Sequence, residues 1–184
     1  MKILFILHVD DEVMLRMLTA RDAEPLYQLT DQSREHLKKW LPWLDEIHSV
    51  DDSLSFIKNS FQLYNDRKGI TAGIFWFDQL VGVVGFNELD FKNKTGYIGY
   101  WLGENYQGKG IMTKAVSALI TYGFSDLSLN RMDLRAAKEN LPSRAIAERI
   151  GFKKEGRIRQ AEWLYDRYVD HIVYGLLKEE WNNE

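Results

Sequence analysis

The chain has 184 residues, of which 45% are hydrophobic and 13% aromatic, with only 3 prolines. This composition excludes a disordered or fibrous chain and predicts one domain over residues 1–184 with a substantial core. The 24 basic and 27 acidic side chains leave a net charge of −3. That charge argues against direct binding of nucleic acid through many phosphate contacts.

The sequence contains no cysteine, which excludes disulfides, thiolate zinc sites and cysteine nucleophiles. The 4 histidines are scattered along the chain and predict no metal site: His8, His36, His48 and His171. The apolar run over residues 3–7 is too short for a secretory signal, and no other stretch is long enough to span a membrane. We therefore expect a cytoplasmic protein without a membrane partner.

The front third of the chain is expected to form one strand followed by helices. The predicted elements are a strand over 13–18, a helix from about residue 20, a helix over 33–41 and a helix from residue 51 or 52 to about 64. Thr19 and Asp22 resemble a capping box, and Pro42 ends the second helix. Asp51 or Asp52 is the expected cap of the third helix.

From residue 70 the pattern favours strands, because Val, Ile, Phe, Tyr and Trp dominate between short polar turns. The predicted strands cover residues 70–77, 80–89, 95–102, 131–136, 152–158 and 168–177. The first three of them form an antiparallel meander. Helical spacing of apolar residues predicts a helix from about 110 to 127 and another over 141–150, and residues 178–184 form a polar tail.

The segment from Trp101 to Thr113 is the most informative one, because closely spaced glycines join a strand to a helix there. Glycine lets the backbone approach a phosphate, and the free N–H groups of a helix N-terminus attract anions. An anion-binding loop is therefore predicted. The alternative interpretation is that the glycines only make a tight turn.

Two other phosphate loops fit this segment poorly. The spacing of Gly103, Gly108 and Lys109 matches a Walker A motif, but Gly110 occupies the place of the Ser or Thr that would bind Mg²⁺. A dinucleotide-binding pattern starts at Gly108 and Gly110 but meets Thr113 in place of its last glycine. A nucleotide hydrolase and a nicotinamide site are therefore disfavoured.

Gln107-x-x-Gly110 at the start of a helix resembles the coenzyme A pyrophosphate loop of the GNAT superfamily of N-acetyltransferases. Met112 departs from the small residue of that pattern and is expected to alter packing near the phosphates. Further motifs follow in the superfamily's order: Ile98-Gly99-Tyr100-Trp101-Leu102, Asn130-Arg131, Asn140-x-x-Ser143, Ile150-Gly151-Phe152 and Glu155-Gly156. With Trp40-Leu41-Pro42-Trp43, the set looks most like the RimJ/RimL branch, which acetylates the N-termini of ribosomal proteins.

The resemblance implies an α/β (α+β) GNAT fold: a mixed, twisted, mostly antiparallel sheet with helices on both faces and central strands that splay near Trp101 and Leu102. Acetyl-CoA would enter this splay and react directly with the amine in a ternary complex, with no metal. Backbone N–H groups of residues 100–103 would hold the acetyl oxygen. The residues implied in cofactor binding are Trp101, Leu102, Gln107, Gly108, Lys109, Gly110, Ile111, Met112, Thr113, Asn140 and Ser143.

Transfer of an acetyl group to an amine requires a neutral amine and a proton for the departing thiolate. An α-amine has a pKa of about 7.7–8.0, whereas that of lysine is about 10.4, so a protein N-terminus needs only modest help from a base. The resemblance implies such an acceptor, Ser or Ala at the N-terminus of a ribosomal protein. An acetyltransferase for a polyamine or aminoglycoside, and a non-catalytic acyl-CoA-binding module, remain alternatives, and a homo-oligomer stays open.

Glu162 is the candidate base, because Gln160-Ala161-Glu162-Trp163-Leu164 resembles a RimL segment with an active-site glutamate. It would act through water; the alternative is an exposed loop charge. Glu88 is the competing base, and Tyr97 replaces a glutamate common in that branch.

Ser143 is the candidate proton donor for the thiolate, since it matches the family's turn after Asn140. Ser143 could instead satisfy N–H groups in the first helical turn, and Asn140 could bind the pantetheine arm or make an Asx-turn. Lys109 is either a phosphate partner or an exposed turn residue. Three tryptophans wall a substrate cleft or belong to the core: Trp40, Trp43 and Trp163.

Overall fold

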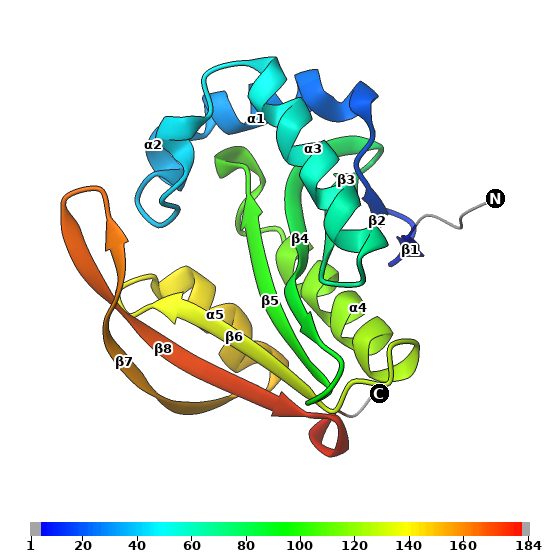
Figure 1. Cartoon of the computed structure of the whole chain (residues 1–184), viewed down its shortest axis with the longest axis vertical. Coiled ribbons are helices and arrows are strands. Elements are labelled where there is room, and N and C mark those ends of the chain that lie inside the picture. Colours follow the sequence, from blue (N-terminus) through cyan, green and yellow to red (C-terminus); the bar gives the residue numbers. More distant parts are fainter. Residues whose placement is uncertain (1–4, 182–184) are drawn as a thin grey trace.

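The computed structural model describes residues 5–181, which form an eight-stranded sheet with helices on both faces (Figure 1). The strands are β1 (Ile6–His8), β2 (Val13–Met17), β3 (Ile70–Trp76), β4 (Gln79–Asp90), β5 (Thr95–Leu102), β6 (Arg131–Ala137), β7 (Lys153–Leu164) and β8 (Arg167–Leu177). The helices are α1 (Ala23–Gln32), α2 (Arg34–Leu37), α3 (Val50–Asn65), α4 (Ile111–Ser125) and α5 (Leu141–Ile150). Short 3₁₀ turns lie at Ala20–Asp22, Leu44–Glu46, Glu104–Tyr106 and Lys178–Glu180.

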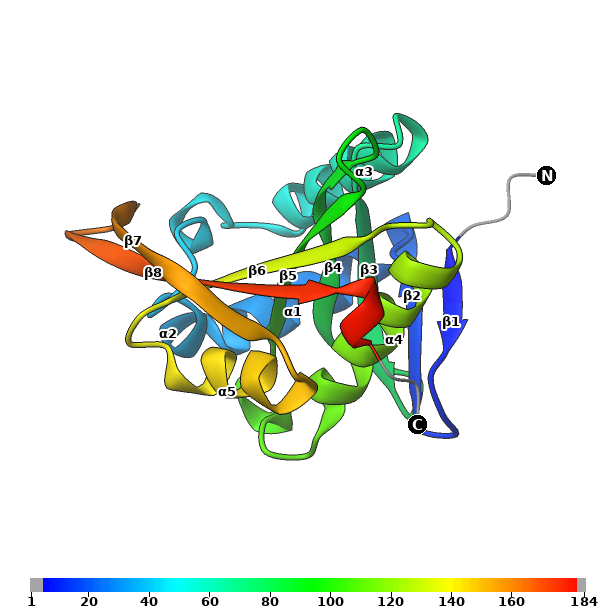
Figure 2. The ribbon, with the colours of Figure 1, turned by 90° about the horizontal axis from the view of Figure 1, so that it is seen from below.

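The strand order is β1-β2-β3-β4-β5-β6-β8-β7, and within it only β5 and β6 run parallel. The β7–β8 hairpin forms the far edge of the sheet (Figure 2). The predicted mixed, mostly antiparallel sheet is therefore confirmed. Over residues 5–181, no helix combines the length and the apolar character that a membrane crossing needs.

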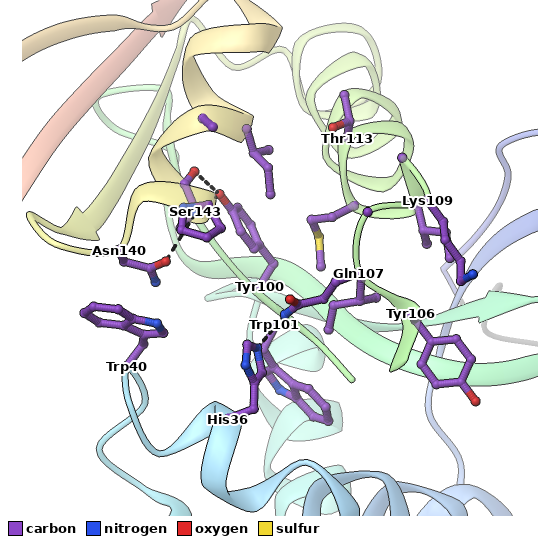
Figure 3. Close-up of a pocket in the computed structure, with 18 of the residues that line it drawn as sticks. His36, Trp40, Tyr100, Trp101, Tyr106, Gln107, Lys109, Thr113, Asn140 and Ser143 are labelled. Atoms are coloured by element: carbon purple, nitrogen blue, oxygen red, sulfur yellow. Dashed lines mark hydrogen bonds between the residues drawn. The ribbon is translucent and has the colours of Figure 1, made fainter. Parts of the chain in front are cut away.

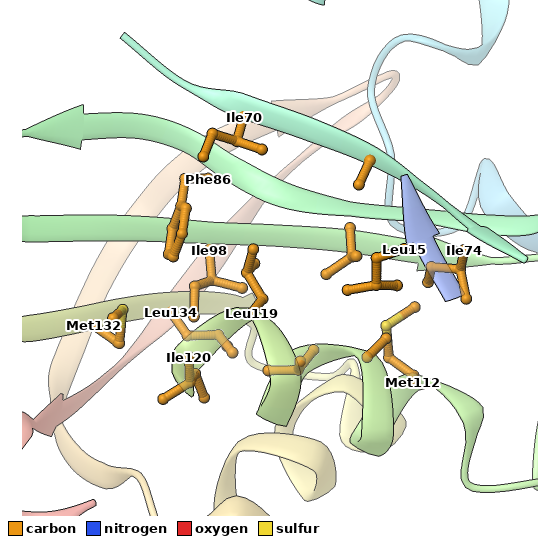
Figure 4. Packing of buried hydrophobic residues seen from close by; sticks show 14 of the residues in the cluster. Leu15, Ile70, Ile74, Phe86, Ile98, Met112, Leu119, Ile120, Met132 and Leu134 are labelled. Carbon is orange, nitrogen blue, oxygen red and sulfur yellow. The ribbon is translucent and has the colours of Figure 1, made fainter. Parts of the chain in front are cut away.

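Both faces of the central part of the sheet are buried, which explains why residues 80–86 of β4 form a continuous apolar run. Neighbouring side chains on a strand point to opposite faces, so Val84 joins the main core under α4 while Val83 joins the smaller core under α1 and α3. In the main core, α4 packs Leu119 and Ile120 against the sheet (Figure 4). Helices therefore cover both faces, as predicted.

The central strands β5 and β6 diverge. β5 pairs with β4 along its whole length, but it pairs with β6 only from Thr95 to Ile98. Residues 99–102 of β5 thus have no partner strand on the β6 side, and their backbone groups on that edge remain available to a ligand. The splay predicted near Trp101 and Leu102 is confirmed.

Two strands differ from the prediction. β1 was not predicted, because it is only three residues long and pairs with β2 alone. β7 continues to Leu164, whereas the sequence pattern indicated an end at Ile158. The pairing with β8 shifts between Ile158 and Glu162, and this irregularity breaks the two-residue period that a regular strand shows. Glu162 therefore lies on a strand and not in a loop.

Two predicted helices also differ. Ser49, not Asp51 or Asp52, is the N-cap of α3, and Asp52 is the third helical residue of a capping box in which its carboxylate accepts from the Ser49 N–H at 2.9 Å. The expected helix over 33–41 is reduced to the four residues of α2. The chain after Leu37 turns instead, which carries Trp40 toward the β7–β8 hairpin.

Candidate active site

A cavity of about 740 Å³ lies where β5 leaves β6, between α2 and the N-terminal ends of α4 and α5 (Figure 3). It is lined by His36, Leu37, Trp40, Leu41, Tyr100, Trp101, Leu102, Tyr106, Gln107, Gly108, Lys109, Gly110, Ile111, Met112, Thr113, Lys114, Asn140, Pro142, Ser143, Ala145, Ile146 and Arg149. Every residue that the sequence proposes for cofactor binding is in this set. Their contacts with coenzyme A remain a prediction.

The glycine loop has the backbone geometry that an anion-binding turn requires. Gly108 and Gly110 have φ angles of 71° and 74°, in the left-handed region that favours glycine. A Cβ atom at either position would meet no atom within 4 Å, so both face open space. Gly110 is the N-cap of α4, whose first turn contains no acidic residue. The N–H groups of that turn and the helix dipole therefore suit a phosphate.

The charged side chains in the cavity wall are all basic. Lys109 places Nζ 5.6 Å from the centre of the Trp76 ring, and Arg149 donates from Nη1 to Thr113 Oγ1 at 3.1 Å. Lys114 also lines the cavity, and its Nζ forms an ion pair at 2.7 Å with Asp10, which is not a lining residue. Among the described residues that line the cavity, none is Asp or Glu. Arg149 was not foreseen, because an arginine on an amphipathic helix gives no sequence signal.

The Met112 side chain packs largely into the protein interior beneath the glycine loop. Its residue surface is 5% exposed, and it packs in the main core near Leu15 and Ile74 (Figure 4) while also lining the cavity. The extra volume relative to a small residue is thus shared with the interior beneath α4.

Tyr100 and Ser143 meet across the splay (Figure 3). The Tyr100 hydroxyl donates to the Ser143 carbonyl at 3.0 Å and lies 3.1 Å from Ser143 Oγ. Burial raises the pKa of Tyr100 to about 12, so this phenol is protonated at neutral pH. From the sequence, Tyr100 was expected to act only through its backbone; its side chain was not foreseen in the site, because an aromatic residue in a strand usually belongs to the core.

Asn140 is the N-cap of α5, and its Oδ1 accepts from the Ser143 N–H at 3.3 Å. This bond spans three residues, so it is a helix N-cap bond and not the Asx-turn considered for Asn140, whose bond spans two residues. Ser143 takes part in this cap through its backbone N–H, while its Oγ lies 3.1 Å from the Tyr100 oxygen in the cavity wall.

The α2 segment forms the opposite wall. His36 contacts Gln107 of the glycine loop through its Nε2 atom, and Trp40 lines the cavity directly. Trp43 instead packs against Trp101, with 6.0 Å between ring centres and the ring planes tilted by 55°. Trp163 is exposed on β7, away from the cavity lining. Of the three tryptophans considered for the cleft, Trp40 is the one in the wall.

Glu162 lies beside this wall and not in the cavity lining. It pairs with Val169 across the β7–β8 hairpin, and both Val169 and Leu164 pack with Trp40. Paired residues share a face of the hairpin, so Glu162 faces the side on which Trp40 lies. Glu88 is exposed on β4 opposite Tyr97 and is also outside the lining.

The sequence is similar to known acetyltransferases over most of its length. Residues 12–153 match the family model described as acetyltransferase (GNAT) domain. YdaF from Bacillus subtilis (strain 168), named as an inferred ribosomal N-acetyltransferase, is 38% identical over 182 residues, which cover 98% of this chain and 100% of that protein. The ribosomal-protein-serine acetyltransferase of Escherichia coli (strain K12) is 33% identical over 169 residues, covering 92% and 94% of the two chains.

Solved structures share the fold. RimL, a ribosomal L7/L12 alpha-N-protein acetyltransferase in complex with coenzyme A, has a TM-score of 0.92 at 29% identity, with 96% of this chain and 99% of that chain covered. The microcin C7 self-immunity acetyltransferase MccE, in complex with acetyl-CoA and AMP, has a TM-score of 0.88 at 35% identity, with 92% and 94% covered.

A splayed sheet with a glycine loop at the head of α4 is thus the scaffold of an acyl-CoA-dependent transferase. The chain belongs to the GNAT acetyltransferase family, and it is an N-acetyltransferase that uses acetyl-CoA.

Proposed function

We propose that this enzyme acetylates the α-amine of a protein N-terminus, Ser or Ala of a ribosomal protein, by direct transfer from acetyl-CoA in a ternary complex. The observation that carries this proposal is the cavity wall, which has basic and apolar side chains and no described carboxylate. A polyamine or aminoglycoside brings several positive charges, which acidic side chains would have to balance. An N-terminus brings a single amine, and the segment of Leu37, Trp40 and Leu41 offers its side chain an apolar wall.

The proposed roles follow the layout of the cavity. The Gln107 to Thr113 loop holds the pyrophosphate, and the free edge of β5 near Tyr100 and Trp101 receives the pantetheine arm and the acetyl oxygen. Ser143 gives a proton to the departing thiolate. Glu162 takes the amine proton through water, since it lies beside the wall and not in it.

A small-molecule amine is the second candidate, because MccE shares 35% identity and is named for self-immunity toward microcin C7. The two proposed functions differ in the acceptor that the same enzyme should acetylate faster, a peptide N-terminus or a small-molecule amine.

Mass spectrometry with acetyl-CoA tests the proposal. The panel contains peptides with free Ser or Ala N-termini, the same peptides with a blocked N-terminus and an internal lysine, spermidine and an aminoglycoside. We expect a mass increase of one acetyl group on the free N-terminus. Faster acetylation of spermidine or the aminoglycoside would overturn the proposal in favour of a small amine.

A further inference from the structure

We propose that Arg149 binds the 3′-phosphate of coenzyme A, and that this contact lets the enzyme distinguish coenzyme A from its 3′-dephospho form. This role rests on the proposed placement of the pyrophosphate at the glycine loop, and it is independent of the amine that accepts the acetyl group. It assigns a ligand to a cation of the cavity wall that has no carboxylate partner among the residues the structure describes.

The charge of Arg149 is available to a ligand, whereas that of its neighbour in the wall is not. Lys114 places Nζ 2.7 Å from Asp10 and 3.5 Å from Glu12, so its charge is already balanced. Arg149 is exposed, and within residues 5–181 it forms no ion pair. Its guanidinium donates from Nη1 to Thr113 Oγ1 at 3.1 Å, and a hydroxyl oxygen leaves the positive charge uncompensated.

Helix α5 runs along the cavity and carries Arg149 to the end that lies away from the proposed sulfur site. Pro142, Ile146 and Arg149 line the cavity at the spacing of one helical face. Arg149 follows Ser143, the proposed proton donor to the sulfur, by six positions, or about 9 Å along the helix axis. There it contacts Thr113 in the first turn of α4, directly after the glycine loop (Figure 3).

The order of groups in coenzyme A matches this layout. The pantetheine arm joins the sulfur to the pyrophosphate, and the ribose with its 3′-phosphate follows on the other side of the pyrophosphate. A cofactor with its sulfur at Ser143 and its pyrophosphate at the glycine loop therefore has its ribose beyond the loop. Arg149 is the cation that the fold places at that end of α5.

The 3′-phosphate needs a side chain, because the backbone donors are proposed to hold the pyrophosphate. A phosphate monoester carries about −1.5 to −2 charge at pH 7, whereas the positive end of a helix is equivalent to only about +0.5. The N-terminus of α4 cannot balance both groups. A guanidinium offers a planar fork of donors that suits phosphate oxygens. Thr113 takes one donor of Arg149 and orients this fork, which leaves other N–H groups for the phosphate.

Arg149→Met tests this role, because it keeps an aliphatic stem and removes the guanidinium. Calorimetry measures the dissociation constants of coenzyme A and of 3′-dephospho-coenzyme A in the absence of any amine. Wild type should bind coenzyme A about 10-fold more tightly than the dephospho form, the lower end of the range for hydrogen bonds to charged groups, since Arg149 is exposed to solvent and salt. In Arg149→Met the dissociation constant of coenzyme A should rise about 10-fold, and that of the dephospho form should change less than about twofold. Arg149→Lys should retain part of the preference, because it keeps the charge but loses the planar fork.

Arg21→Met is the matched control for the loss of one positive charge. Arg21 is exposed on the turn at Ala20–Asp22, outside the cavity lining, so both dissociation constants should stay at their wild-type values. Equal losses for the two cofactors in Arg149→Met would place Arg149 at the pyrophosphate and overturn the proposal, and unchanged affinity for coenzyme A would overturn it as well. Retained binding of the dephospho form shows that Arg149→Met is folded.

Gly110→Asp separates a failure of this role from a failure of the proposed cofactor placement. If the glycine loop holds the pyrophosphate, this variant should weaken both cofactors to the same extent, because both carry that group. Wild-type affinity of Gly110→Asp for both cofactors would count against the proposed placement, and with it against the layout that puts the 3′-phosphate at Arg149. Equal weakening of both cofactors by Gly110→Asp, with no selective loss in Arg149→Met, would overturn the role of Arg149 alone.

Discussion

The Nε2 atom of His171 lies 3.2 Å from Oε2 of Glu162, across the β7–β8 hairpin. Their side chains are only 22% and 29% exposed. The contact with His171 therefore holds the Glu162 carboxylate in one place, on the face of the hairpin against which Trp40 packs. A carboxylate that is held but still reached by water has the properties of a base acting through a water molecule.

Glu162→Gln should lower kcat/KM severalfold to about 100-fold at pH 7, because the amide keeps the size and hydrogen bonding of the side chain but loses its basicity. The defect should shrink above pH 8, where an α-amine is mostly neutral without help. Steady-state rates from pH 6.5 to 9 measure both effects. Wild-type rates in Glu162→Gln at pH 7, together with a loss in Glu88→Gln, would move the base to β4.

Gly110→Asp should weaken coenzyme A binding at least about 10-fold, because it places a negative charge where the helix dipole attracts the pyrophosphate. Gly110→Asn is the matched comparison: Asn has nearly the same shape and tolerates the left-handed conformation, with φ of 74° here, better than most residues. Calorimetry on the folded variants separates charge from backbone strain. Equal affinities of the Asp and Asn variants would place the phosphates elsewhere.

Local sequence patterns were sufficient to predict the parts of the site made by consecutive residues. The glycine loop, the start of α4 and the turn at Asn140 before α5 depend on the backbone preferences of a few neighbouring residues, so a short segment of sequence is enough to predict them. The run from Thr95 to Leu102 likewise predicted β5 with its observed bounds.

The remaining parts of the site depend on contacts between distant residues. Tyr165 on the turn between β7 and β8 donates to the Leu41 carbonyl at 2.6 Å and accepts from the Leu44 N–H at 3.1 Å, which ties the hairpin to the α2 segment. The contacts of Tyr100 with Ser143 and of His36 with Gln107 are also long-range. Hydrophobic periodicity and residue propensity carry no information about such pairs. The side of the cavity formed by the α2 segment could therefore not be predicted from the sequence.

Arg16→Met should destabilise the fold by about 2 kcal/mol at pH 7, because it leaves the buried Asp22 carboxylate without its charged partner. Arg16 donates to both Asp22 oxygens at 2.9 Å. Burial alone would raise the pKa of Asp22, but hydrogen bonds from Arg16 and Thr19 outweigh it and hold the pKa below its usual value.

A lowered pKa in the folded state contributes stability that is present above about pH 4 and is lost as the pH falls through the folded pKa. Urea unfolding at pH 7 and pH 3 should therefore show a smaller effect of Arg16→Met in acid. Lys38→Met removes the exposed pair with Asp45 and should cost little at either pH. An effect of Arg16→Met that is equal at both pH values would assign it to lost packing on Phe75, whose ring centre lies 3.9 Å from the guanidinium carbon.

Peptides with a free Ser or Ala N-terminus should outperform matched peptides whose only amine is lysine, and the preference should narrow as the pH rises. With a pKa of about 7.8, the neutral fraction of an α-amine grows less than about 10-fold between pH 7 and 9, whereas that of lysine, with a pKa of about 10.4, grows roughly 100-fold. If amine ionisation sets the preference, the ratio of kcat/KM values should fall about 10-fold over this range. Competition between the two peptides in one reaction, followed by mass spectrometry, measures the ratio directly. A constant ratio would assign the preference to contacts in the cavity wall, and a preference for the lysine peptide at both pH values would contradict the proposed acceptor while leaving the coenzyme A site intact.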